Sequence, residues 1–179
     1  MDNFPKALDF VLRPDIEGGN DDDPQDPGGR TSRGIEQREW DAYCKLHDYP
    51  QCDVWRAPQV SIGEIYRKYY WQPYCQVLPA GVDLSFFDEH VNTGLHEAAV
   101  ILQRCLHVTV DGHIGVITMR ALSEEDPRSI VNDYALERER VYREMRGFPR
   151  FGRGWLKRAK LCRDVSLALI VGLTPPTGA

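Results

Sequence analysis

Apolar residues recur at helical spacing along most of this chain. The first set shares one face of a helix and consists of Phe4, Ala7, Leu8 and Val11. Pro14 lacks a backbone N–H and is expected to end or kink this helix. The same periodicity predicts helices over 37–46, 84–91, 98–106 and 114–122, and a last helix that contains Trp155 and Leu169.

Capping signals mark two helix starts. Ser61 and Glu64 have the spacing of a capping box, in which the hydroxyl and the carboxylate each bind a free backbone amide. A helix is therefore expected to begin there and to run through the aromatic residues that follow. Asp126 and Pro127 combine an N-cap acid with a proline at the first helical position, and they predict a long helix that Gly147 ends.

The fold class follows from these elements. The stretch 18–34 is rich in glycine, proline and aspartate, which indicates an irregular segment or a small twisted hairpin. At 179 residues the chain has the length of one compact domain. The sequence therefore predicts a mainly α fold of the α+β kind, a helical domain with a short β-hairpin.

Composition is ordinary, but the charges are unevenly distributed. A hydrophobic fraction of 42% and a charged fraction of 27% are typical of globular proteins, and the net charge of −5 argues against a nucleic-acid-binding protein. Six acidic and no basic residues lie between Asp15 and Asp26, whereas ten basic and two acidic residues lie between Arg138 and Arg163. The basic stretch is either a solvated helix face or a surface that holds an anionic polymer.

The sequence indicates neither a metal site nor a cofactor site. His90 and His96 are six positions apart, off the spacing of metal ligands on one helix face. The cysteines are dispersed and lack a CxxC pair, so they are expected to be mostly buried thiols of a reducing compartment: Cys44, Cys52, Cys75, Cys105 and Cys162.

Glu17 is the candidate general acid. Glycoside hydrolysis needs a carboxylic acid that stays protonated, together with a second carboxylate or an activated water across the sugar ring. Glu17 follows the first predicted helix, where the negative end of the helix dipole and the neighbouring acidic residues both disfavour a further negative charge. The alternative interpretation is an ordinary helix-end residue before a glycine pair.

A second carboxylate and a hydroxyl follow in the same segment. Asp26 comes nine residues after Glu17, beyond a loop that can fold back, so its carboxylate can activate water or stabilise the transition state. Gly28 and Gly29 permit close approach of the backbone to a ligand, and the Thr31 hydroxyl can position the attacking water. The alternative interpretation is a solvated loop. A calcium-binding loop is set aside, because the residue pattern of an EF-hand is not met.

These residues carry a family resemblance. The N-terminal motif of the glycoside hydrolase family 108 muramidases resembles Glu17-Gly18-Gly19, Asp26-Pro27-Gly28-Gly29, Thr31 and Gly34-Ile35. The E-x8-D-x5-T pattern of phage-type lysozymes is also similar, although Thr31 stands one position early and Ser32 occupies the other register. Asn20 and Glu36 depart from the family pattern, which has an aromatic residue and a threonine there. The stretch from Val110 to Gly112 is similar to a predicted peptidoglycan-binding segment.

The resemblance implies a lysozyme-like enzyme that hydrolyses the β-1,4 bond between N-acetylmuramic acid and N-acetylglucosamine in peptidoglycan glycan strands. Glu17 is then the catalytic acid, while Asp26 and Thr31 hold or activate water. The chain is expected to form one lysozyme-like domain at 1–172, with a catalytic part at 1–94, a helical peptidoglycan-binding-like part at 95–172 and a disordered tail at 173–179. The alternatives are a non-catalytic cell-wall-binding module and a lytic transglycosylase.

Four further residues are candidates for substrate binding. Gly28 and Ser32 belong to the motif itself. The Asn92 amide can bind an N-acetyl group, although a helix C-cap is an equally good interpretation. Tyr70 can stack on a sugar ring, although an aromatic residue at helical spacing is more often part of the core.

The chain carries no visible targeting signal. Its N-terminus has neither the basic segment nor the continuous apolar stretch of a signal peptide, and the apolar run at 165–171 is far shorter than the about 20 residues that span a bilayer. We therefore expect cytoplasmic synthesis and action on the cell wall after release, with a holin-type release partner. We also expect a monomer that binds no nucleic acid.

Overall fold

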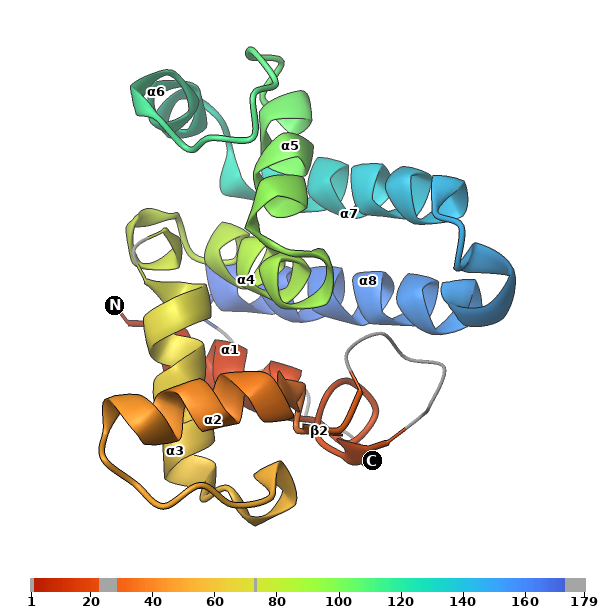
Figure 1. Ribbon diagram of the computed structural model, residues 1–179. Coiled ribbons are helices and arrows are strands. Elements are labelled where there is room, and N and C mark those ends of the chain that lie inside the picture. Colours follow the sequence, from red (N-terminus) through yellow and green to blue (C-terminus); the bar gives the residue numbers. More distant parts are fainter. Residues whose placement is uncertain (1, 23–28, 73, 173–179) are drawn as a thin grey trace. The chain divides into compact units, whose positions relative to one another are not determined.

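The computed structural model describes residues 2–22, 29–72 and 74–172. The chain forms two compact units, which we call the N-terminal unit (Phe4–Gln72) and the C-terminal unit (Met1–Asn3 with Pro73–Ala179) (Figure 1). The described part is mainly helical, with one small antiparallel sheet, which confirms the predicted fold class.

The N-terminal unit begins with α1 (Phe4–Val11), which buries Phe4, Ala7, Phe10 and Val11. The edge of the Phe4 ring packs against Trp71, with ring centroids 5.5 Å apart. The other elements of this unit are β1 (Asn20–Asp21), β2 (Thr31–Ser32), β3 (Ile35–Glu36), α2 (Gln37–Leu46), the 3-10 turn η1 (Val54–Arg56), α3 (Gln59–Ile65) and the π-helical η2 (Tyr66–Trp71).

The strands form a three-stranded sheet in the order β1-β2-β3. Thr31 pairs with Asp21 on one side and with Glu36 on the other, so these three residues share one face. Ser32 lies on the opposite face beside Ile35, and both are fully buried. The antiparallel pair within 18–34, where a hairpin was expected, is β1 with β2, and β3 forms a second, tighter hairpin with β2.

The predicted helix at 37–46 is confirmed as α2, whereas the predicted start at Ser61 is wrong. Helix α3 begins at Gln59, after Pro58 in an extended conformation, and Ser61 is buried inside it. Pro58 lacks a backbone N–H, and the first N–H groups of a helix have no partner within the helix. A proline at the N-terminal start of a helix therefore leaves no donor unpaired. A reciprocal bond of the capping-box kind occurs instead at α2, where the N–H of Glu36 donates to Glu39 at 3.2 Å.

In the C-terminal unit, the short 3-10 turn η3 (Cys75–Val77) precedes the central helix α4 (Val82–Thr93). Helix α4 packs against α5 (Leu95–Cys105), α7 (Pro127–Glu144) and α8 (Phe148–Ile170), as Figure 1 shows. Every residue of α4 from Val82 to His90 is buried, so this helix has no solvent face in that stretch. Helix α6 (Val116–Glu124) corresponds to the helix predicted at 114–122.

Helix α7 begins as predicted but ends earlier. The Asp126 carboxylate accepts a bond from the N–H of Arg128 at 3.2 Å, and Pro127 is the first helical residue. The helix ends at Glu144 because Met145 is extended, and Gly147 instead caps the start of α8. The expected end at Gly147 is therefore wrong, because the helix ends three residues earlier and a short connection leads from it to α8.

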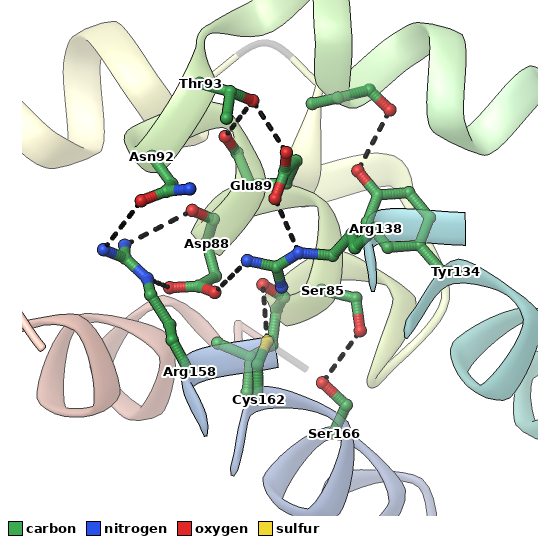
Figure 2. Close-up of polar contacts among 12 residues, drawn as sticks. Ser85, Asp88, Glu89, Asn92, Thr93, Tyr134, Arg138, Arg158, Cys162 and Ser166 are labelled. Atoms are coloured by element: carbon green, nitrogen blue, oxygen red, sulfur yellow. Dashed lines mark hydrogen bonds and ion pairs between the residues drawn. The ribbon is translucent and has the colours of Figure 1, made fainter. Parts of the chain in front are cut away.

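Two acidic residues of α4 are paired with two arginines inside the C-terminal unit (Figure 2). Arg138 of α7 donates to Asp88 at 2.7 Å and pairs with Glu89 at 2.5 Å. Arg158 of α8 donates to Asp88 at 2.9 Å. All four side chains are buried, so the two negative and the two positive charges balance each other inside the unit. These ion pairs link helices α4, α7 and α8.

The cysteines are free thiols, and Cys44, Cys75 and Cys162 are buried, in line with expectation. Within the described residues, the helices are too short or too polar to cross a membrane. The tail at 173–179 lies outside the described residues.

Candidate active site

Glu17 lies in the tight turn that follows α1. Its backbone N–H donates to the carbonyl of Val11 at 3.0 Å, and the N–H of Gly18 donates to the carbonyl of Arg13 at 2.8 Å. A side chain at Gly18 would place its Cβ 2.3 Å from the carbonyl oxygen of Leu12, so the turn requires glycine there. The turn holds the Glu17 backbone in place and leaves its side chain half-buried.

Glu17 lies further along the chain than the end of α1. Helix α1 ends at Val11, and Glu17 comes six residues later, beyond Pro14. Its N–H nevertheless binds the carbonyl of Val11, so the turn leads the chain back to the C-terminal end of the helix, where the negative end of the dipole lies. The effect of that dipole on the Glu17 carboxyl group stays a prediction.

Gly34, in the turn between β2 and β3, borders the Glu17 side chain. It has a φ of 77°, and a Cβ at this position would lie 3.2 Å from Oε2 of Glu17 and 2.4 Å from the hydroxyl oxygen of Tyr66. The buried Tyr66 hydroxyl donates to the carbonyl of Arg33 at 2.8 Å. The absence of a side chain at Gly34 thus lets the candidate acid and a buried hydroxyl approach the same turn.

Tyr70 connects this region to two further carboxylates. Its hydroxyl donates to Oε1 of Glu39 at 2.6 Å, and its ring lies 5.3 Å from the ring of Tyr66. Burial raises the pKa of Tyr70, and the bond to Glu39 and the negative charges of Glu39, Glu36 and Glu17 raise that pKa further. The Tyr70 hydroxyl therefore stays protonated and lies within electrostatic reach of Glu17.

The sequence pointed to Tyr70 but not to Tyr66 or Glu39. Stacking of Tyr70 on a sugar stays a prediction, and the structure adds that the negative charge of Glu17 acts on this residue. The spacing of Tyr66 and Tyr70 by four residues placed them on one helix face, which was the available signal. Their association with the hairpin is a long-range contact that no local pattern encodes.

Thr31 and Ser32 have different environments. Thr31 is half-buried on the sheet face that also carries Asp21 and Glu36. Ser32 is fully buried, and its hydroxyl accepts a bond from Nε of Arg33 at 3.3 Å. Of the two residues that can take the threonine position of the lysozyme motif, Thr31 therefore has the more accessible hydroxyl. The roles of both residues towards substrate stay predictions.

The other candidates lie elsewhere. Asp26 and Gly28 fall outside the described residues, so the proposed second carboxylate stays a prediction. Asn92 belongs to the C-terminal unit, where its amide N–H donates to the Tyr142 hydroxyl at 3.0 Å. Its oxygen accepts from Arg158 at 3.2 Å (Figure 2). An N-acetyl group at Asn92 would have to compete with these two bonds.

The predicted turn at Asp111 is present and is closed by a buried glutamine. The Gln103 side chain donates to the Asp111 carboxylate at 2.7 Å and to the His113 carbonyl at 2.9 Å. Its oxygen accepts from the N–H groups of Asp111 at 3.0 Å and Gly112 at 2.8 Å. This turn is thus a rigid part of the C-terminal unit.

The N-terminal unit offers the groups for acid–base chemistry. The half-buried carboxyl group of Glu17 lies close to the Tyr66 hydroxyl, and its charge acts on the Tyr70 hydroxyl. The Thr31 hydroxyl and the Asp21 carboxylate share one face of the sheet in the segment that follows Glu17. In the part of the chain that the structure describes, histidine, cysteine and acidic residues do not gather in groups of three or more that would suit a metal ion.

Two family models match the chain. The model described as glycosyl hydrolase 108 matches residues 9–94, and the model described as a predicted peptidoglycan domain matches residues 97–160. Among solved structures, that of SagA from Brucella abortus is similar, with a TM-score of 0.81 and 30% sequence identity over 94% of this chain and 95% of that chain. A search of the curated proteins found no match. Glu17, Gly34, Tyr66 and Tyr70 all lie inside the first matched range.

Proposed function

The chain belongs to the glycosyl hydrolase 108 family, and we propose that it is an N-acetylmuramidase, which hydrolyses the β-1,4 bond between N-acetylmuramic acid and N-acetylglucosamine. The family supports a glycoside hydrolase, and the predicted peptidoglycan domain supports peptidoglycan as the substrate. The observation that carries the proposal is the position of Glu17, a half-buried carboxyl against the glycine turn of the hairpin.

In this mechanism Glu17 protonates the glycosidic oxygen while the bond to the anomeric carbon of the muramic acid breaks. Positive charge develops on the sugar ring, and the negative charges of Glu36 and Glu39, which act on the Tyr70 hydroxyl together with that of Glu17, favour that charge. Water then attacks the anomeric carbon and loses a proton to a carboxylate. Asp26 and Thr31 are the residues proposed to hold this water, by the family resemblance.

The decisive experiment is mass spectrometry of the fragments released from purified sacculi. The wild-type protein is expected to produce fragments with reducing N-acetylmuramic acid ends, and Glu17→Gln is expected to lower their rate of release by at least about a hundredfold, as the loss of a general acid does. Asp9→Asn removes an exposed carboxylate from α1 of the same unit and serves as the matched control, with activity expected near that of the wild type.

Three outcomes would contradict the proposal in different ways. Fragments that end in 1,6-anhydromuramic acid would identify a lytic transglycosylase, which releases its product without water. Sacculi that bind the protein but stay uncut would identify a wall-binding module. Equal rates for the wild type and Glu17→Gln would remove Glu17 from its catalytic role even if sacculi are cleaved.

A further inference from the structure

Trp55, in η1, is an exposed tryptophan that is nevertheless firmly held. Its side chain and backbone together are 41% exposed, whereas Trp40 and Trp71 of the same unit are 3% and 2% exposed. The indole N–H donates to the carbonyl of Thr31 at 2.9 Å, and the backbone N–H donates to the carboxylate of Asp53 at 2.9 Å. Trp55 thus contributes little to the core, yet its ring has a defined position.

One face of the Trp55 ring is covered by Arg30. The guanidinium carbon of Arg30 lies 3.7 Å from the ring centroid. This guanidinium is itself held by ion pairs to Asp53 at 2.8 Å and to Asp22 at 3.5 Å. The exposed area of the indole therefore lies on its other face and outer edge. Since the ring is already ordered, a ligand that stacks on it loses little affinity to side-chain ordering.

Trp55 and Glu17 are attached to the same hairpin. The carbonyl that accepts the indole bond belongs to Thr31 of β2, and the turn that follows β2 borders Glu17. A second bond ties the segment around η1 to this turn, because the Arg33 guanidinium donates to the carbonyl of Ala57 at 2.5 Å. The exposed indole is thereby placed at a fixed position beside Thr31, on the hairpin whose turn borders Glu17.

A sugar of the N-acetylhexosamine type matches such a surface. In a β-1,4-linked chain the ring substituents are equatorial, so each face of the sugar ring presents C–H groups with a small positive charge. The face of an indole carries a negative potential and a large apolar area. The two surfaces are therefore complementary in shape, in charge and in their release of water.

We propose that Trp55 forms a sugar-binding subsite next to the catalytic residues, in which the free face of the indole stacks on an N-acetylhexosamine ring of the glycan strand. The choice of ligand rests on the proposed muramidase function. In this role Trp55 positions the substrate and takes no part in proton transfer.

The test measures binding in the Glu17→Gln protein, so that no cleavage takes place. The probe is chitotetraose, a soluble chain of β-1,4-linked N-acetylglucosamine, and its dissociation constant is obtained by calorimetry. Adding Trp55→Ala is expected to weaken binding about tenfold, whereas Trp55→Phe, which keeps an aromatic face but lacks the indole N–H, stays within about threefold. Tyr69→Ala removes another exposed aromatic ring of this unit and is expected to leave binding unchanged.

A second measurement does not depend on any substitution at Trp55 being tolerated. In a ¹⁵N spectrum of the Glu17→Gln protein, saturating chitotetraose is expected to shift the indole signal of Trp55 and to leave those of the buried Trp40 and Trp71 in place. An unshifted Trp55 signal would overturn the proposal. So would wild-type affinity in Trp55→Ala, or equal losses in Trp55→Phe and Trp55→Ala, because the indole bond to Thr31 would then be the important feature.

Failure of the subsite and failure of the muramidase function can be told apart. If the wild type cleaves sacculi while Trp55→Ala binds chitotetraose normally, the subsite is wrong and the function stands. If the wild type does not cleave sacculi but Trp55→Ala loses binding, the subsite stands without the function. In an active enzyme, Trp55→Ala should raise KM more than it lowers kcat, because stacking away from the reacting bond is uniform binding.

Discussion

Gly34 shows how a single residue sets the surroundings of the candidate acid. Its positive φ and the missing side chain together allow the hairpin turn to lie against Glu17 and Tyr66. Gly29 also has a positive φ, of 64°, but among the described residues no atom lies within 4 Å of where its Cβ would be. Substitutions at the two glycines can therefore distinguish the effect of backbone strain, which both positions share, from the effect of contact with Glu17, which only Gly34 has.

We expect Gly34→Ala to abolish most of the activity, while Gly29→Ala retains it. Both substitutions introduce strain of about 1 kcal/mol, since L-residues disfavour positive φ. At Gly34 the new methyl group must also displace the Tyr66 hydroxyl or the Glu17 carboxylate, and a shift of this size can lower activity about a hundredfold. Rates on sacculi, compared with urea midpoints, test this. Equal activity losses in both variants would show that strain alone matters.

At the residue scale, the catalytic candidates that the sequence predicted belong to one short motif. Glu17 and Thr31 were predicted because their spacing and glycine context are local, and their roles stay predictions. Tyr66, Glu39 and Trp55 were not, because each reaches the site through a contact over 24 to 33 residues, as in the bonds from Trp55 to Thr31, from Tyr70 to Glu39 and from Tyr66 to Arg33. Such pairings depend on tertiary packing that helical periodicity does not specify.

At the scale of elements, periodicity located the helices better than it located their ends. The helix at 37–46 was predicted within the right bounds, because Trp40, Tyr43 and Cys44 form a clear apolar stripe. The start of α3 was misplaced because a capping pattern at Ser61 competes with Pro58, and proline determines the boundary. The charged residues inside α4 were not expected, since their partners come from α7 and α8.

Removing one member of that buried ion network should destabilise the protein strongly. Arg138→Met leaves Asp88 and Glu89 without one of their buried cationic partners, and breaking a buried pair in this way costs about 3–5 kcal/mol. Arg140→Met on the same helix is the control, because Arg140 is 46% exposed and pairs at the surface with Glu137 and Glu144. Urea unfolding should show a large fall in midpoint for the first variant and little change for the second. Similar midpoints would contradict the network's contribution.

Asp88 should also make the stability of the protein depend on acidity. Burial raises the pKa of Asp88, but the charges of Arg158 and Arg138 and their hydrogen bonds outweigh it, so the pKa lies below its ordinary value. Stability from this carboxylate is therefore present above the unfolded-state pKa of about 3.9 and is lost as the pH falls through the folded-state value. Asp83 acts in the opposite sense, because burial raises its pKa.

The comparison of wild type with Asp88→Asn isolates this effect. At pH 6 the variant should have the lower urea midpoint, because Arg138 and Arg158 lose their shared partner. As the pH is lowered below about 4, the wild type should lose stability more steeply than the variant, so that the two midpoints converge. Parallel curves would show that Asp88 titrates alike in the folded and unfolded chain.

At the scale of the whole molecule, the matched families and the compact units divide the chain at different places. The hydrolase model extends to residue 94, whereas the N-terminal unit ends at Gln72, so the whole of α4 belongs both to the hydrolase match and to the C-terminal unit. The mainly α, lysozyme-like fold was predicted from the sequence, while the parts at 1–94 and 95–172 stay a prediction. Function is therefore best tested on the full chain.

The basic stretch near the C-terminus becomes a defined surface in this fold. Seven basic and no acidic residues lie between Arg146 and Arg163. Four of them are exposed on α8 at spacings of three and four residues, so they share one face: Arg150, Arg153, Lys157 and Lys160. This basic face lies within the range matched by the predicted peptidoglycan domain. Peptidoglycan carries carboxylates on its peptide stems, which are the complementary charge.

We expect this basic face to hold the protein on the cell wall. In the Glu17→Gln protein, replacing all four residues with glutamine should lower the fraction bound to sacculi at least about tenfold at 0.1 M salt, where charges interact over about 10 Å. Wild-type binding should weaken in the same way as salt approaches 1 M. The matched control replaces four arginines of the other helices α5, α6 and α7, namely Arg104, Arg120, Arg140 and Arg143. It changes the net charge equally, so equal losses in both variants would show that net charge, rather than the α8 face, governs binding.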